Sequence, residues 1–236
     1  MRRDYHNWHS PRLDRRMELL VFGHGGSPVL VFPTSRARFF EYEDMGMLRA
    51  LAGKIDAGQL QLFCVDSVDA ESWYNRSIHP HERVQRHIAY EEYVLFEVLP
   101  FVRGVNGAQQ ITVTGCSFGG YHALNFALRH PDVATACISM SGAFDLKPFM
   151  GGYYDELFYF NNPVDYLPNI RDPWFLDRYQ TMKLVLAVGD HDICLGENFR
   201  MAGILGAKQI PHWLDVWTGG ERHDWPLWHR MAVKFF

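Results

Sequence analysis

Gly115-Cys116-Ser117-Phe118-Gly119 is a G-x-S-x-G motif, and its surroundings decide the fold. A strand-like apolar run, residues 111–114, precedes the motif, and a helix-like run, residues 121–129, follows it. On such a sharp strand-to-helix turn the serine hydroxyl is lifted into the open, and the flanking glycines let the backbone pass closely without Cβ atoms. The motif therefore predicts Ser117 as a nucleophile.

Apolar runs bounded by turn residues recur on both sides of this motif and predict seven strands. They are residues 17–22, 29–32, 60–65, 111–114, 135–140, 183–188 and 213–217. Residues 83–102 place apolar side chains near helical spacing, and the tail from Leu227 is also helix-like. Strands that alternate with helices predict a mostly parallel sheet with helices on both faces. The short link 23–28 predicts that residues 17–22 and 29–32 form an antiparallel hairpin that opens the sheet.

Residues 144–180 interrupt this alternation. They contain four prolines, a Gly-Gly pair and many aromatic side chains, which is too apolar for a linker and too broken for one long helix. We expect short helices over the carboxyl ends of the strands, forming a small cap. An ordinary crossover connection with extra packing is the alternative.

Length and composition limit the class of protein. A chain of 236 residues with 47% hydrophobic content favours a single domain, residues 1–236. The net charge of -4, without a long basic or acidic block, argues against nucleic acid or a membrane as partner and favours a small molecule. No run of 18 apolar residues and no secretory leader occur, so we expect a cytoplasmic protein. Whether the chain forms a homo-oligomer stays open.

Neither a metal nor a cofactor is expected. The four cysteines are widely spaced and suggest no disulfide framework or zinc site; they are Cys64, Cys116, Cys137 and Cys194. The histidine pairs His79/His81 and His6/His9 have spacings that a metal could use, but no acidic residue at a strand end accompanies them. We expect these histidines to lie on the surface or to cap helices.

A nucleophilic serine needs a base and an acid that orients the base. His223 lies in the loop that follows strand 213–217, and two carboxylates follow strand 183–188 in Gly189-Asp190-His191-Asp192. Asp192 is favoured because the loop has room to turn toward the strand ends by that point. Asp190 remains the alternative, and the residue that is not the acid is expected to brace the loop.

An oxyanion needs two backbone N–H donors, and the residue after the nucleophile, Phe118, supplies one. The other is expected just after residues 29–32, where Pro33 cannot donate and Thr34, Ser35 and Arg36 remain. Ser35 is our choice. Arg36 could attract an anionic group of a substrate or could simply be solvated. Trp73, Tyr74 and Trp225 are candidates for the substrate pocket and equally candidates for the core.

These residues resemble the α/β-hydrolase superfamily, and within it the esterase group that includes esterase D, S-formylglutathione hydrolase and the antigen 85 mycolyltransferases. The resemblance rests on residues 115–120, 139–145 and 189–192, and on His223-Asp224-Trp225-Pro226-Leu227-Trp228, which is similar to the closing H-x-W-x-x-W of many such esterases. Ser35-Arg36-Ala37 is similar to their oxyanion segment. The resemblance implies an α/β-hydrolase fold and a serine esterase or acyltransferase with nucleophile Ser117, acid Asp192 and base His223.

The sequence therefore predicts a serine-dependent carboxylic-ester hydrolase that acts on a small-molecule ester through an acyl-enzyme. An acyltransferase or thioesterase with the same three residues is the first alternative. A non-catalytic binding protein on a hydrolase scaffold is the second, and the presence of all three residues counts against it.

Overall fold

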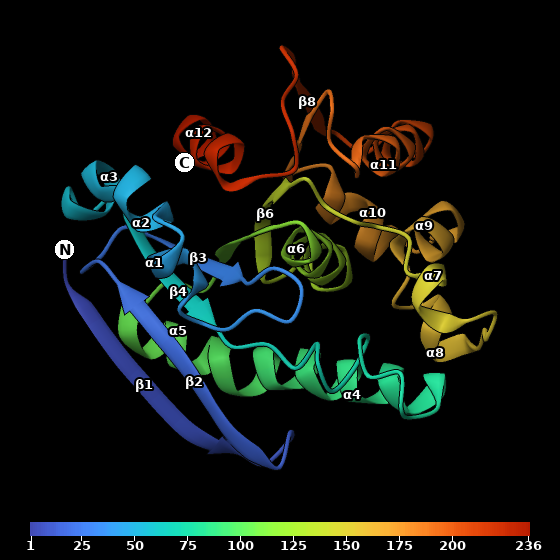
Figure 1. The fold of residues 1–236 in the computed structure, drawn as a ribbon, viewed down its shortest axis with the longest axis horizontal. Coiled ribbons are helices and arrows are strands. Elements are labelled where there is room, and N and C mark those ends of the chain that lie inside the picture. Colours follow the sequence, from blue (N-terminus) through green and yellow to red (C-terminus); the bar gives the residue numbers. More distant parts are fainter.

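The computed structural model describes residues 1–236 and contains one eight-stranded sheet with the order β1-β2-β4-β3-β5-β6-β7-β8 (Figure 1). In this order, each neighbouring pair from β4 through β3 to β8 is parallel, whereas β1–β2 and β2–β4 are antiparallel. The strands are β1 (Arg3–Ser10), β2 (Arg15–Phe22), β3 (Ser27–Phe32), β4 (Leu60–Val65), β5 (Ile111–Cys116), β6 (Ala134–Met140), β7 (Lys183–Gly189) and β8 (Trp213–Trp217). Every strand predicted from an apolar run is confirmed.

The N-terminal antiparallel hairpin exists, but the prediction of its strands is wrong. β2 pairs with β1 on one side and with β4 on the other, and β3 lies on the far side of β4. The link from β2 to β3 steps across the start of β4, where a Cβ on Gly26 would lie 2.4 Å from the carbonyl oxygen of Gln59. β4, whose six residues are all buried, thereby gains a neighbour on each side.

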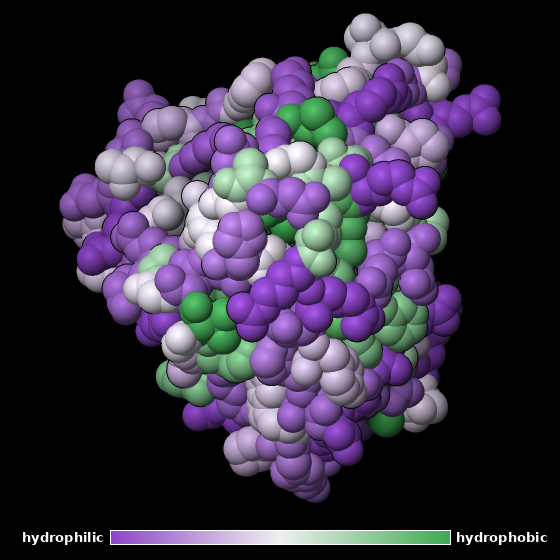
Figure 2. All heavy atoms as spheres, turned by 90° about the vertical axis from the view of Figure 1, so that its left-hand side faces the viewer, coloured by the Kyte–Doolittle hydropathy of each residue, from purple (hydrophilic) through white to green (hydrophobic).

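β1 is the strand that the apolar pattern does not predict. Its sequence, RDYHNWHS, is polar, and most of its side chains stay exposed or half-buried at the edge of the sheet. In Figure 1 the β1–β2 hairpin extends along the left-hand side of the molecule, and hydrophilic residues predominate on the face seen from that side (Figure 2). An edge strand of this kind has no apolar run, because it does not contribute to the core on both faces.

Helices cover both faces of the sheet (Figure 1). One face carries α1 (Glu41–Asp44), α2 (Met47–Ala50), α3 (Ala52–Asp56) and α12 (Trp225–Phe235), whose apolar residues form one buried cluster with the strands. The other face carries α4 (Pro80–Tyr93), the π-helix η1 (Val94–Val98), α5 (Leu99–Asn106), α6 (Phe118–Arg129) and α11 (Leu195–Ala207), which contribute to a larger cluster. The predicted layering is confirmed.

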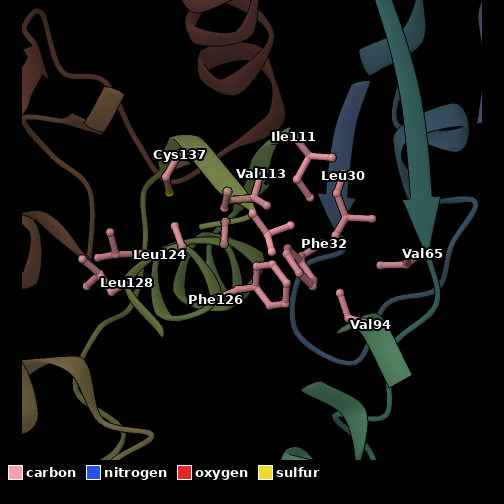
Figure 3. Close-up of a cluster of buried hydrophobic side chains, with 14 of the residues drawn as sticks. Leu30, Phe32, Val65, Val94, Ile111, Val113, Leu124, Phe126, Leu128 and Cys137 are labelled. Atoms are coloured by element: carbon pink, nitrogen blue, oxygen red, sulfur yellow. The ribbon is translucent and has the colours of Figure 1, made fainter. Parts of the chain in front are cut away.

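The larger cluster fixes α6 against the centre of the sheet. Leu30 and Phe32 from β3 and Val113 from β5 lie opposite Leu124 and Phe126 from α6 (Figure 3). All five side chains are buried. Because such interiors are packed as densely as organic crystals, α6 has little freedom to move relative to β3 and β5. The residue between β5 and α6 is therefore held at a defined place.

Residues 144–180 form short helices, as predicted. They are α7 (Lys147–Met150), α8 (Glu156–Tyr159), α9 (Pro163–Tyr166), the 3-10 helix η2 (Leu167–Asn169) and α10 (Pro173–Tyr179). Leu146, Met150 and Phe158 from this segment are buried in a third cluster together with Trp73 and Phe118. The segment thus supports α6 from the side. None of the helices in the structure combines the length and the apolar character that crossing a bilayer requires.

A buried histidine makes the stability of this fold sensitive to acid. His87 in α4 packs against Trp73 and Tyr121. Burial, with a smaller contribution from His122, lowers the pKa of His87 to about 3. The unfolded chain binds a proton at His87 near pH 6.5 and the folded chain does not, so stability is lost as the pH falls from that value toward 3.

We expect the free energy of unfolding to fall by roughly 1 to 2 kcal/mol for this group alone between about pH 6.5 and pH 5, because the slope rises from half of its limit of about 1.4 kcal/mol per pH unit toward that limit. In a His87→Phe variant this part of the loss should vanish, and urea titrations at the two pH values measure it. The exposed His9 is the matched control, because His9→Gln should leave the difference between the two pH values unchanged. An equal pH dependence in wild type and His87→Phe would contradict the expectation.

Candidate active site

Ser117 stands on a strained turn between β5 and α6. Its backbone has φ 55° and ψ -122°, an unusual conformation for a residue other than glycine. Its N–H donates to the carbonyl of Met140 on β6 at 2.8 Å. A Cβ on Gly115 would lie 2.3 Å from the backbone of Gly119, and a Cβ on Gly119 would lie 2.4 Å from the carbonyl oxygen of Phe32. The glycines of the motif are therefore required by close backbone contacts.

The structure brings Ser117, His223 and Asp192 together from three different loops. His223 Nε2 lies 2.8 Å from Ser117 Oγ, and His223 Nδ1 lies 2.8 Å from Asp192 Oδ1. A carboxylate can only accept, so Nδ1 carries the proton and donates it to Asp192. Nε2 is then left as the acceptor for the hydroxyl of Ser117. This arrangement can withdraw a proton from the serine.

Asp192 is buried yet held in its charged form. Burial raises its pKa, but the nearby Ser141 side chain and the hydrogen bonds from His223 and from the N–H of Cys194 outweigh burial, so the pKa lies below its usual range. The last of these bonds is 2.7 Å long. Asp192 therefore stays ionised at neutral pH and favours a positive charge on the adjacent imidazole.

Asp190 has a different place. Its carboxylate accepts from the N–H groups of Gly219, Gly220 and Glu221 at 2.9, 3.0 and 2.8 Å. Burial raises the pKa of Asp190, but the hydrogen bonds from these three N–H groups lower it by more. The pKa of Asp190 therefore lies below its usual range. Asp190 thus braces the loop that carries His223, and only Asp192 contacts the imidazole.

A cavity of about 470 Å³ opens beside the serine. It is lined by Thr34, Ser35, Met45, Ser117, His223, Asp224, Trp225, Pro226 and Trp228. Of the residues proposed for binding, Ser35 and Trp225 lie in its wall. None of residues 144–180 does, so the short helices do not close over it.

The other predicted pocket residues lie elsewhere. Trp73 is fully buried in the cluster that contains Phe118, and it does not line the cavity. Tyr74 is half-buried, and its hydroxyl donates to Ser35 Oγ at 2.7 Å. Arg36 is exposed, with its guanidinium carbon 5.2 Å from the centre of the Tyr74 ring.

The backbone N–H groups of the two expected oxyanion donors, Phe118 and Ser35, both lack an acceptor in the protein. Phe118 is the first residue of α6, where a backbone N–H has no partner within the helix. The N–H of Ser35 has no acceptor in the protein, whereas the N–H of Thr34 donates to Glu41 and that of Arg36 to Asp69. Both unpaired N–H groups belong to segments that meet at Gly119.

Two residues of the site, Met45 and Trp228, are not among the predicted site residues. Met45 reaches the cavity from the link between α1 and α2, more than 70 residues before Ser117. Trp228 donates its indole N–H to Ser141 Oγ at 2.9 Å, and its ring lies 5.0 Å from that of His223, edge to face. The H-x-W-x-x-W run contains Trp228, but only the fold shows that it supports the histidine.

One group of potential metal ligands occurs here. Ligand atoms of Asp192, Cys194 and His223 all lie within 4.8 Å of one another. Two of them, the carboxylate oxygen and the imidazole nitrogen, are already hydrogen-bonded to each other. Of the histidine pairs in the sequence, His79 caps α4 by accepting from the N–H of His81 at 3.2 Å, as expected of a capping residue.

Similar solved structures share this fold. A ferulic acid esterase superimposes with a TM-score of 0.78 at 16% sequence identity, covering 99% of this chain and 96% of that one. An S-formylglutathione hydrolase from Agrobacterium tumefaciens gives 0.74 at 13% identity, covering 98% and 92%. The S-formylglutathione hydrolase from Staphylococcus aureus gives 0.71 at 17%, covering 99% and 94%. At these identities the likeness establishes the α/β-hydrolase fold.

No curated protein matches the chain in sequence. The sequence model of the family described as "Putative esterase", however, matches residues 12–229, which include the serine, both candidate acids and the histidine. Most of the chain is covered by this match. The protein therefore belongs to the Putative esterase family.

Proposed function

We propose that this protein is a serine-dependent carboxylic-ester hydrolase that acts through an acyl-enzyme on Ser117, with His223 as the base and Asp192 as the acid. The observation that carries the proposal is the continuous chain of two 2.8 Å hydrogen bonds from Ser117 through His223 to Asp192. A serine hydroxyl next to a neutral imidazole that is oriented by a carboxylate is the arrangement that makes serine a nucleophile.

In the first half of the reaction, Ser117 Oγ attacks the carbonyl carbon of the ester while His223 Nε2 takes the hydroxyl proton. The π electrons of the carbonyl move onto its oxygen, and the N–H groups of Phe118 and Ser35 stabilise this oxyanion. The tetrahedral intermediate then collapses, the bond to the alcohol oxygen breaks, and His223 gives the alcohol its proton. The acyl group remains on Ser117.

In the second half, water replaces the alcohol. His223 takes a proton from the water as the hydroxide adds to the acyl carbon, and the same donors hold the second oxyanion. Collapse breaks the bond to Ser117 Oγ, which recovers its proton from His223. The ionised Asp192 stabilises the imidazolium that forms in each half.

The cavity supports a substrate of modest size. About 470 Å³ is room for a small ester, and Met45, Trp225 and Pro226 offer apolar surface for its acyl or alcohol part. The family description and the names of the similar structures support an ester as the substrate class.

Turnover of p-nitrophenyl esters of increasing acyl length, with and without added methanol, tests this proposal. We expect release of p-nitrophenol with the free acid as the main product. Methanol should divert part of the acyl-enzyme to the methyl ester without changing how fast p-nitrophenol appears if acylation limits the rate. Predominant transfer to methanol would indicate an acyltransferase instead, and no p-nitrophenol release above background with any ester would refute the proposal.

A further inference from the structure

The loop after β3 presents three consecutive backbone N–H groups, and two of them are bound to carboxylates. Thr34 donates to Glu41 Oε2 at 2.8 Å, and Arg36 donates to Asp69 Oδ2 at 3.4 Å. Ser35, between them, donates to nothing in the protein. Ser35 is exposed, so its N–H is open to solvent, whereas the N–H groups on either side of it are bound by acids from other segments. Of the three N–H groups, that of Ser35 is therefore the one available to a ligand in the adjacent cavity.

The side chain of Glu41 forms hydrogen bonds only with Thr34. It is half-buried at the start of α1 and forms no ion pair with a basic residue. Burial raises its pKa, and hydrogen bonds from the N–H and the hydroxyl of Thr34 oppose this effect. A carboxylate that loses water contacts without gaining a cation costs stability, and the two hydrogen bonds from Thr34 offset part of that cost for Glu41.

Asp69 connects the same loop to the helix of the nucleophile. It is fully buried, and its Oδ1 lies 2.8 Å from Nε2 of His122. His122 belongs to α6, and its ring packs against those of Phe118 and Phe32, with ring centres 5.1 and 5.7 Å apart. One carboxylate therefore contacts both the loop of Ser35 and the helix that begins with Phe118.

Tyr74 forms a third connection. Its hydroxyl donates to Ser35 Oγ, and its ring lies 5.3 Å from that of Phe118, edge to face. Arg36, the residue after Ser35, has a φ of 57°, which a side chain other than glycine rarely adopts. Such a backbone conformation persists only when its surroundings enforce it. The hydrogen bond from the N–H of Arg36 to Asp69 is one contact that holds the loop in this conformation.

We propose that Glu41 and Asp69 are positioning residues for the oxyanion site, which hold the peptide groups on either side of Ser35 so that its N–H stays free beside that of Phe118. The proposal rests on the function proposed above. Neither carboxylate lines the cavity, so neither touches the substrate. Donors that are held in place before the reaction need no reorganisation when the oxyanion forms, and this is the source of their effect on rate.

Glu41→Ala tests the proposal, with Glu41→Gln as the conservative variant. Removing the acceptor releases the N–H of Thr34 and loosens the loop, so kcat for p-nitrophenyl acetate should fall about 10- to 100-fold, while KM should change little. Gln retains an amide oxygen that can accept from Thr34 and should recover most of the rate. Glu43→Ala is the matched control, because Glu43 lies on the same helix, pairs with Arg3 at 2.7 Å and should leave kcat unchanged.

An inhibitor that forms an oxyanion separates positioning from general damage. Ser117 adds to the carbonyl carbon of a methyl trifluoromethyl ketone, and the adduct carries an oxyanion like that of the transition state. The Ki of this inhibitor should therefore rise in Glu41→Ala by the same factor as kcat/KM falls. Should Glu41→Ala not fold, Asp69→Ala carries the same prediction, because it removes the acceptor of the Arg36 N–H and the partner of His122 together. Wild-type kcat and Ki in the folded variant would overturn the inference, as would a loss of kcat with unchanged Ki.

The two proposals fail in different ways. If the wild-type protein does not cleave p-nitrophenyl acetate, or if Ser117→Ala cleaves it equally well, the proposed function fails. If wild type is active and Ser117→Ala is not, while Glu41→Ala keeps full activity and inhibitor affinity, only the roles of Glu41 and Asp69 are wrong.

Discussion

Replacing Ser117 with alanine is expected to lower kcat for p-nitrophenyl acetate about a million-fold. The reason is that the serine and histidine of such a triad act as a unit, so that losing one removes nearly the whole effect of the set. The remaining rate over that of water would come from binding and from the oxyanion donors. Steady-state release of p-nitrophenol by purified wild-type and variant protein measures the difference.

The control for this experiment is Ser77→Ala. Ser77 is exposed, and its hydroxyl bonds only the side chain of Asn75. The variant should keep wild-type kcat. If Ser117→Ala retained even a tenth of the wild-type turnover, another nucleophile would have to be sought, and the hydrogen-bonded chain from Ser117 to Asp192 would have to be explained as a structural feature.

Asp192→Asn is expected to have the second largest effect, a fall in kcat of about ten thousand-fold. An amide at this position removes the negative charge that stabilises the imidazolium and permits the histidine to adopt the wrong tautomer. The side chain keeps its size, so the buried position can still be filled. Measuring kcat and the unfolding midpoint for the same samples separates chemistry from stability.

Asp190→Asn is the matched comparison, two residues earlier in the same loop. One amide oxygen replaces a carboxylate that accepts three N–H groups, so the loop of His223 should loosen and kcat should fall far less, by about tenfold. A larger loss in Asp190→Asn than in Asp192→Asn would mean that the wrong carboxylate has been assigned as the acid.

The sequence predicts most of this fold because its central strands are buried on both faces. Such strands appear as continuous apolar runs, and β4 and β7 are examples that need no knowledge of their neighbours. β1 has no such run, so it could not be recognised. The pairing of β2 with β4 depends on where a distant strand inserts, and a short glycine-containing link alone favours a hairpin between β2 and β3 instead.

The same distinction applies to the site. Ser117 and His223 follow strands at the same edge of a parallel sheet, so their meeting could be expected from chain order and topology. The separate places of Asp190 and Asp192 depend on how one loop turns, and loop geometry is not encoded in a periodic pattern. The contacts of Glu41, Asp69 and Tyr74 with residues 34–36 join segments up to 39 residues apart, and no motif signals them.

The mass of the intact protein after brief reaction with a fluorophosphonate tests most directly whether Ser117 is the nucleophile. The phosphorus reacts only with a serine that is already activated, and the adduct resembles the tetrahedral intermediate. The predicted result is one phosphonyl group per chain, located on the peptide that contains Ser117, and no adduct in Ser117→Ala. A protein that stays unlabelled, or one labelled at a different residue, would contradict the account.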